Sequence, residues 1–387
     1  MRLPVYLDYL ATTPVDPRVA ERMAGCLTRD GLFGNPASRS HVYGWQAEEA
    51  VENARREVAE LAGADPREIV WTSGATEADN LAIKGVFGHD PSKGRHVISC
   101  LAEHKAVLDS CRHLESKGAS LSLLAPGADG RVDPGALAAA LRPDTVLVSL
   151  MHVNNELGTL YAVRELARLV RQHAPHARLL VDAVQAAGKL DCAPLELGAD
   201  AVALSAHKLH GPKGAGVLAL AGEFPLEPLV HGGGQERGLR SGTENVPACV
   251  GLGVALELAE LERDATLARW RELHAFFVQR LALLPGARVL EAGRERVPSI
   301  VSLVWPGAPA AVRLHQLERC GVFASAGSAC QAAKNELSPT LKALGLSDDD
   351  ARSTLRFSFG RTTTREELEQ ALAALEQVGR ELAPLGR

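Results

Sequence analysis

Between Ile69 and Leu204 the sequence alternates short apolar runs with stretches whose apolar residues recur at helical spacing. The apolar runs are 69–72, 96–99, 121–124, 146–150, 179–181 and 202–204. Strands that are apolar without interruption are typical of a mostly parallel sheet, because the helices between parallel strands cover both of its faces. The pattern therefore predicts an α/β fold. The run 216–220 follows Leu204 too closely for a helical crossover, so we expect it to pair antiparallel with a neighbour.

The rest of the chain predicts further helices and a second, smaller unit. Helices are expected at about 16–29, 41–61, 75–86, 105–116, from 133 onward, at 163–173, 246–284, 311–319 and 364–382, with an extended arm at 5–9 and strands at 299–304 and 355–359. A chain of 387 residues is long enough for two domains. We assign residues 15–255 to a large domain, and residues 1–14 with 256–387 to a small α+β domain.

Lys208 lies just after the apolar run 201–204, in the segment Ser205-Ala206-His207-Lys208. A lysine at the carboxyl end of such a strand points into the crevice where α/β sheets bind ligands. An amine held away from bulk water can lose its proton, become nucleophilic and form a Schiff base with an aldehyde cofactor. The alternative is an ordinary surface lysine after a buried strand. The other motifs favour the first interpretation, in which Lys208 holds pyridoxal 5′-phosphate (PLP).

Two further segments are suited to contact such a cofactor. Asp182 ends the strand before that of Lys208, where a carboxylate can bind a protonated pyridine nitrogen, and Gln185 can reach another polar atom of the ring. Ala75 and Thr76 open a helix after Gly74, where backbone N–H groups and a hydroxyl would face a phosphate. Taken singly, Asp182 also fits a loop cap, and the segment with Ala75 and Thr76 also fits a plain helix start.

Single polar residues at four other positions are suited to the same site. His104 opens a helix after a strand, where it can stack on a flat ring and transfer protons, or lie on the surface. The amide of Asn155 suits a carboxylate or a ring oxygen. Thr243 lies in a small polar segment that suits a phosphate or an ordinary turn. Arg356, between apolar residues on a strand, needs an anion, which is either a structural carboxylate or that of an amino-acid substrate.

Cys330 has the most unusual surroundings of the seven cysteines. Small residues flank it from Ala324 to Ala333 and Lys334 follows, so it reads as an exposed thiol near a cation, which favours the reactive thiolate. The odd number of cysteines and the lack of C-x-x-C pairs argue against disulfides and structural zinc, and we expect no metal. The cysteines expected to be packing residues are Cys26, Cys100, Cys111, Cys249 and Cys320, with Cys192 in a loop.

Charge and composition argue against some partners. The net charge is −5 without a basic block, and aromatic residues make up only 4%, so we expect no nucleic-acid partner. No apolar stretch is long enough to span a membrane, and the N-terminus lacks the apolar run of a signal peptide. We therefore expect a cytoplasmic enzyme with no membrane partner.

Together, and in order along nearly the whole chain, these motifs resemble those of cysteine desulfurases of the NifS/IscS type, which are class-V aminotransferases among the fold-type-I PLP enzymes. The matching segments are Tyr6-Leu7-Asp8-Tyr9, Phe33-Gly34-Asn35-Pro36, Thr72-Ser73-Gly74-Ala75-Thr76-Glu77, Glu103-His104-Lys105, Val153-Asn154-Asn155-Glu156, Ser205-Ala206-His207-Lys208, Arg240-Ser241-Gly242-Thr243, Gly327-Ser328-Ala329-Cys330 and Arg356-Phe357-Ser358. The resemblance implies the fold-type-I architecture, with a large domain around a mostly parallel mixed sheet, a smaller α+β domain, and a homodimer.

The resemblance also implies a role for each matching residue. Lys208 carries PLP and moves protons, His104 stacks on the ring as acid and base, and Asp182 pairs with the pyridine nitrogen. Residues implied to bind the ring hydroxyl or the phosphate are Gln185, Asn155, Ala75, Thr76, Ser205, His207 and, donated by the partner subunit, Thr243. Residues implied to bind the substrate carboxylate are Arg356, Asn155 and Asn35. Cys330 attacks the sulfur of the bound L-cysteine, which yields L-alanine and a persulfide.

The persulfide sulfur would then pass to an acceptor protein, such as an iron–sulfur scaffold or a sulfur carrier. The segment after Cys330 and the C-terminus depart from the housekeeping pattern, which leaves the acceptor open. A selenocysteine lyase or a related class-V aminotransferase is the alternative activity, and a PLP-binding sulfur-relay scaffold the alternative class. Transamination would not need the thiol of Cys330, and a scaffold would not need Lys208, His104, Asp182 and Cys330 together.

Overall fold

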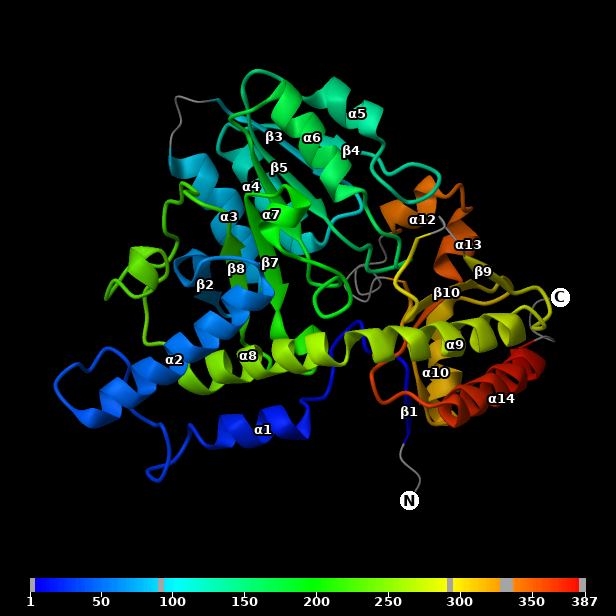
Figure 1. The fold of residues 1–387 in the computed structure, drawn as a ribbon. Coiled ribbons are helices and arrows are strands. Elements are labelled where there is room, and N and C mark those ends of the chain that lie inside the picture. The colour runs from blue at the N-terminus through cyan, green and yellow to red at the C-terminus, as the bar shows by residue number, and fades with distance from the viewer. Residues whose placement is uncertain (1–3, 90–93, 291–294, 328–336, 383–387) are drawn as a thin grey trace.

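The structure is a computed structural model that describes residues 4–89, 94–290, 295–327 and 337–382. Its centre is a seven-stranded sheet in the order β2-β8-β7-β6-β5-β3-β4 (Figure 1). The strands are β2 (Ile69–Thr72), β3 (His96–Cys100), β4 (Ser120–Leu124), β5 (Thr145–Met151), β6 (Arg178–Asp182), β7 (Ala201–Ser205) and β8 (Gly216–Leu220). β8 runs antiparallel to β7 and β2, and the other pairs are parallel. Both the α/β fold and the antiparallel strand are confirmed.

Helices cover both faces of this sheet. On one face pack α3 (Ala75–His89) and α4 (Lys105–Ser116), and on the other α2 (Val42–Leu61), α6 (Val163–His173) and α8 (Val246–Leu261). Successive strand residues point to opposite faces, and both sides are apolar, so most of the inner strands are apolar along their length. The edge strand β4 contains Ser120 and Ser122 and is partly exposed. The remaining helices of this region are α1 (Pro17–Ala24), α5 (Pro134–Ala140) and α7 (Pro194–Leu197).

A smaller unit carries its own sheet and its own hydrophobic core. β9 (Arg288–Leu290), β10 (Ile300–Val304) and β12 (Thr354–Ser358) form an antiparallel sheet in the order β12-β10-β9. The helices around it are α9 (Arg263–Leu281), α10 (Ala310–Arg319), α12 (Pro339–Ala343), α13 (Asp348–Arg352) and α14 (Arg365–Leu382). In the core the rings of Phe277 and Phe357 meet edge to face, with centroids 5.4 Å apart.

α8 lies below the large sheet in Figure 1, and α9 continues from it across the small unit. The sequence predicts one helical region from 246 to 284, and this is wrong in detail, because Glu262 separates two helices with a backbone (φ −97°, ψ 1°) that departs from helical values. α1 is also shorter than predicted and ends at Ala24 instead of about Arg29. Cys320 was expected to be a packing residue, but it follows the last turn of α10 and is exposed.

The N-terminal arm joins the two units. β1 (Val5–Tyr6) pairs in parallel with β11 (Val322–Phe323) of the small unit. The chain then crosses to the large sheet, where Thr13 N–H donates to the carbonyl of His207 at 2.9 Å. This crossing places Leu10 between the two units, where its N–H bonds to Ser358 and its carbonyl accepts from Lys208, just after β7.

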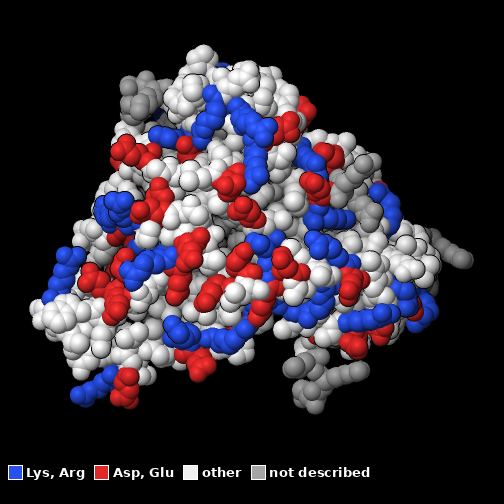
Figure 2. All heavy atoms as spheres, in the orientation of Figure 1, with Lys and Arg blue, Asp and Glu red and all other residues white. Residues whose placement is uncertain are grey.

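The surface seen in Figure 2 carries acidic and basic side chains intermixed over both units. Within the described part of the chain, no helix has the length and apolar character needed to cross a bilayer.

Candidate functional site

A cavity of about 550 Å³ opens at the carboxyl edge of the large sheet, beside the N-terminal arm. Sequence-predicted residues from six separate segments line it, namely Ala75, Thr76, His104, Asn155, Asp182, Gln185, Ser205, His207, Lys208 and Arg356. Five of these segments meet because each follows or forms the end of a strand at the same edge of the large sheet, whereas Arg356 reaches the cavity from the middle of β12 in the small unit. The volume lies in the range of cofactor sites.

Lys208 reaches this cavity from a single turn after β7. All of β7 is buried, and residues Ala206–Lys208 turn the chain at its end. The Nζ atom of Lys208 donates to the carbonyl oxygens of Leu10 (2.5 Å) and Ala11 (2.9 Å) of the N-terminal arm. The arm therefore fixes where the amine lies.

Asp182 stands on the neighbouring strand, with its carboxylate facing the same cavity. It is 8% exposed, and its Oδ1 accepts from the backbone N–H of Val184 at 3.0 Å. Burial raises the pKa of Asp182, while the nearby His104 and Lys208 act in the opposite direction. A carboxylate in this setting gains from a proton-bearing or cationic partner in the cavity.

Gln185 follows in the turn after β6 and separates this cavity from a second one. Its Nε2 donates to the carbonyl of Leu10 at 3.4 Å, whereas its buried Oε1 has no hydrogen-bond partner in the described structure. A buried amide oxygen without a donor is unfavourable, so a hydroxyl donor in the cavity would stabilise it.

His104 is the N-cap of α4. Its Nδ1 accepts from the backbone N–H of Ala106 at 3.1 Å, which leaves Nε2 to face the cavity. The ring is open to the cavity but otherwise enclosed by protein, and this desolvation lowers the pKa of His104 below its usual value. This favours the neutral form of the ring, which can stack on a flat ligand.

The start of α3 forms a cradle for an anion. Gly74 has φ +148°, and a Cβ on Gly216 of β8 would lie 2.5 Å from its Cα, so two glycines let the backbones approach here. The first N–H that bonds within the helix is that of Glu77, and those of Ala75 and Thr76 precede it.

Arg240 pairs with Glu77, the acidic residue in the first turn of α3, so that this carboxylate repels a bound anion less. Glu77 accepts from Arg240 Nε at 2.8 Å and from the backbone N–H of Ser73 at 2.8 Å. Although burial raises it, the pKa of Glu77 lies below its usual value because of these two donors. The charge of this carboxylate is therefore balanced beside the cradle.

Arg356 closes the cavity from the small unit and is 3% exposed. Its guanidinium donates to the carbonyl of Asn155 at 2.8 Å and to Asp8 Oδ1 at 3.1 Å. The sequence left a structural carboxylate and a substrate carboxylate open as its partner. Asp8 supplies the first, and the position in the cavity wall is compatible with the second.

Two predicted residues lie away from this cavity, and a third is not among the residues that the structure describes. Asn35 is exposed, and its Oδ1 accepts from the backbone N–H of Ala37 at 2.9 Å. Thr243 is exposed and lines a neighbouring cavity with Ser73. Cys330 lies outside the described residues. The roles implied for all three stay predictions.

Sequence reasoning missed a group of buried acids beside the cavity. Asp79 lines it from the second turn of α3, is 1% exposed, and has no hydrogen-bond partner for either carboxylate oxygen among the described residues. Burial, Asp182 and Glu103 raise the pKa of Asp79 well above its usual value. In the sequence, only the helical position of Asp79 and its apolar neighbours could have indicated that it is buried. The same features also occur around acids on a helix surface.

The donor set fits PLP. The α3 cradle suits the phosphate, Asp182 the pyridine nitrogen, the orphaned Oε1 of Gln185 the ring hydroxyl, and the amine of Lys208 the aldehyde. The described residues contain no group of three or more His, Cys, Asp or Glu side chains placed to hold a metal ion.

Another buried acid lies just outside this cavity. Glu156 follows Asn155 in the loop after β5 and is 4% exposed. Its Oε1 accepts from Ser338 Oγ at 2.8 Å, and its backbone oxygen accepts from Ser302 Oγ at 2.6 Å. The loop that contributes Asn155 is thus fixed to the small unit.

Comparison with known proteins points in one direction. The family model for class-V aminotransferases matches residues 5–371. The chain is 50% identical over 390 residues to the cysteine desulfurase IscS of Pseudomonas putida KT2440, with 100% of this chain and 96% of that protein covered. A NifS-like protein structure matches with a TM-score of 0.92 and 35% identity, covering 98% of this chain and 100% of its own. The structure of SspA in complex with cysteine matches with a TM-score of 0.80 and 34% identity, covering 93% and 99%.

Proposed function

The chain belongs to the class-V aminotransferases, among the cysteine desulfurases, and we propose that it removes sulfur from L-cysteine with PLP as its cofactor. The substrate C–S bond breaks, a proton takes the place of sulfur on that carbon, and L-alanine is released. The sulfur atom joins the thiol of Cys330 as a persulfide. The carbon is reduced while the two sulfur atoms share the oxidation, so this half of the reaction needs no outside oxidant.

The observation that supports the proposal most directly is that one cavity collects Lys208, Asp182 and Arg356. These are an amine, an acid and a guanidinium, which match an aldehyde, a pyridine nitrogen and an α-carboxylate. When bound, PLP would draw electrons from the attached amino acid and so weaken its bonds. A cysteine-bound structure of the SspA relative supports cysteine as the substrate.

The residues of this chain would then act as follows. Arg356 would hold the substrate carboxylate, with Asn155 and Asn35 beside it. Lys208 would hold the cofactor and carry a proton away from the α-carbon of the substrate. His104, with Nδ1 already bonded to Ala106 N–H, would exchange protons with the substrate at Nε2.

The remaining features of the proposal concern assembly and partners. We keep the division into residues 15–255 and residues 1–14 with 256–387, which the two separate hydrophobic cores support. A homodimer would let the partner subunit's Thr243 reach the phosphate. A sulfur-acceptor protein for iron–sulfur cluster assembly or another sulfur pathway, and a cytoplasmic location, belong to the same proposal.

The decisive experiment supplies L-cysteine and a thiol reductant to the PLP-loaded protein and measures alanine and sulfide. Equal amounts of the two products are expected. Cys330→Ser should abolish sulfide and keep the cofactor absorbance, and Lys208→Ala should remove the covalent link that borohydride traps. Amino transfer to an oxoacid without sulfide would overturn the proposal in favour of an aminotransferase.

Selenocysteine distinguishes the other alternative. A selenocysteine lyase would release selenide from L-selenocysteine and leave L-cysteine unchanged. A sulfur-relay scaffold would bind PLP and accumulate alanine no faster than free PLP does. Either result would replace cysteine desulfuration as the proposed activity.

A further inference from the structure

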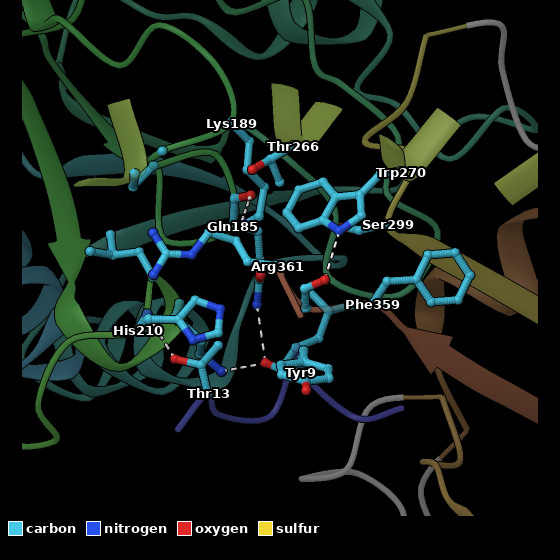
Figure 3. Close-up of a pocket in the computed structure, with 17 residues that line it drawn as sticks. Tyr9, Thr13, Gln185, Lys189, His210, Thr266, Trp270, Ser299, Phe359 and Arg361 are labelled. Carbon is cyan, nitrogen blue, oxygen red and sulfur yellow. Dashed lines mark hydrogen bonds between the residues drawn. The ribbon is translucent and has the colours of Figure 1, made fainter. Parts of the chain in front are cut away.

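A second cavity of about 40 Å³ lies behind the PLP cavity, between the two units (Figure 3). This volume holds a few water molecules and not a cofactor. Leu10, Gln185 and Lys208 line both cavities and so form the wall between them. A residue of the small cavity that holds one of these three residues in place therefore also affects the shape of the PLP cavity.

Lys189 lies on the rear side of that wall. Figure 3 shows it next to Thr266 at one end of the small cavity, with Tyr9 and Thr13 at the other. It is only 8% exposed, and its Nζ donates to the backbone oxygen of Gln185 at 3.1 Å. Among the described residues no carboxylate forms an ion pair with it. Burial lowers the pKa of Lys189 to about 8, opposed by Cys192 and assisted by Lys208.

The backbone forces the lysine into this position. Gly188 has φ +68°, which reverses the chain, and a Cβ at this position would lie 2.6 Å from the Cβ of Ala259 on α8. Lys189 N–H then donates to the carbonyl of Ala186 at 2.9 Å, so its side chain folds back over the turn that begins after Asp182. Burying an amine that makes only one hydrogen bond costs free energy, so the position of Lys189 needs another explanation than stability.

Lys189 bonds to the backbone of Gln185, and two hydrogen bonds link Gln185 to Lys208. The side chain of Gln185 donates to the carbonyl of Leu10 at 3.4 Å, and the same carbonyl accepts from Lys208 at 2.5 Å. The buried Oε1 of Gln185 has no donor among the described residues. A shift of the Gln185 backbone would therefore move both this oxygen and the acceptor of Lys208.

We propose that Lys189 is a positioning residue for the cofactor, which holds the backbone of Gln185 so that its amide faces the PLP cavity. This inference rests on the proposed function, because it takes PLP as the occupant of that cavity. A lysine that only fills the space between the two units is the alternative.

The test measures the dissociation constant of PLP from the full-length protein, together with the absorbance of the bound cofactor. Lys189→Met keeps the apolar stem and removes the donor, and it should weaken PLP binding about tenfold. Lys189→Arg keeps a donor and should weaken it about threefold or less. Lys117→Met, on an exposed lysine after α4, is the matched control and should change nothing.

A double-mutant cycle with Gln185→Ala separates positioning from general support. If Lys189 acts through the Gln185 amide, Lys189→Met should weaken PLP binding by less than about twofold once that amide is gone. An equal loss in both backgrounds, or a lower melting temperature with an unchanged dissociation constant, would overturn the inference. A wild-type protein that binds no PLP would instead overturn the proposed function. Urea unfolding of each apo variant identifies any that fails to fold, and Lys189→Arg then carries the test.

Discussion

Ser338 Oγ donates a hydrogen bond of 2.8 Å to Glu156 Oε1, and both side chains are buried. A Cβ on Gly327 would lie 3.6 Å from Glu156 Oε2. Gly327 and Ser338 stand on either side of the sequence segment that contains Cys330. Both lie close to the carboxyl group of Glu156 in the large unit. That group follows Asn155, which lines the cavity at the carboxyl edge of the large sheet.

Glu156→Ala should lower the free energy of unfolding by about 1–3 kcal/mol, because it leaves the buried hydroxyl of Ser338 without an acceptor. Glu156→Gln keeps an amide oxygen in the same place and should lose less than half as much. Urea denaturation of the two variants measures this difference. Equal losses would show that the hydrogen bond contributes nothing to stability.

Asp182→Asn should reduce cysteine turnover by roughly 10²-fold or more, because it keeps the shape of the side chain and removes the charge that faces the cofactor. The cofactor absorbance should also shift. Asp200 is the matched control, since it is 7% exposed and bound by Arg171 and Arg178 away from the cavity. Asp200→Asn should lower stability and leave the turnover of each folded holoenzyme intact. A similar drop in both variants would remove the catalytic argument for Asp182.

His96 should make the fold less stable in mild acid. Its ring lies between Thr145 Oγ1 and Ser122 Oγ, each 2.8 Å away, and burial lowers the pKa of His96 to about 4. As the pH falls from 6.5 toward 4, the unfolded chain binds a proton that the folded chain does not. The free energy of unfolding should then fall by up to about 1.4 kcal/mol per pH unit for this proton.

The experiment compares urea unfolding at pH 7.5 and pH 5 for wild type and His96→Gln. Other buried histidines give the same sign, so the wild-type slope is their sum. His96→Gln should be less stable at pH 7.5 and show a shallower loss toward pH 5. His113→Gln, at an exposed position of α4, should keep the wild-type slope. If His96→Gln lost as much stability between pH 7.5 and pH 5 as the wild type does, the lowered pKa of His96 would not be a cause of the acid sensitivity.

Glu236→Gln should destabilise the fold by up to about 3–5 kcal/mol, because it removes the buried carboxylate that faces Arg55 and leaves this buried charge only the more exposed Glu52, at 2.9 Å, and Glu244, at 3.8 Å. The pair is bidentate, with N–O distances of 2.7 and 2.8 Å, and Glu236 also accepts from Trp71 N–H. Thermal unfolding of Glu236→Gln, Arg55→Met and the double variant checks this. The double variant should be more stable than Glu236→Gln alone, and a strictly additive loss would argue against a buried pair.

The regular elements of the α/β region were predictable, because a strand buried on both faces is apolar along its own length. The break at Glu262 was not, since no glycine or proline in the sequence marks it. Lys208 and Asp182 were predictable as site residues because the ends of parallel strands share one edge.

The contacts made by the N-terminal arm were not predictable in the same way. Leu10 and Ala11 act through backbone carbonyls, which leave no trace in the sequence. The bond from Arg356 to Asp8 joins residues that only the folded chain brings together. The roles of Cys330, Thr243 and Asn35 stay predictions.

The arm also sets an order of events during synthesis. β1 has its strand partner only once Val322 and Phe323 have been made, and Leu10 N–H bonds to the hydroxyl of Ser358. Leu10 and Ala11, whose carbonyls accept from Lys208, are therefore made long before the residues that pair with their segment. A nascent chain can build the large sheet before Val322, Phe323 and Ser358 exist, but the arm that holds Lys208 gains these partners only after they have been made.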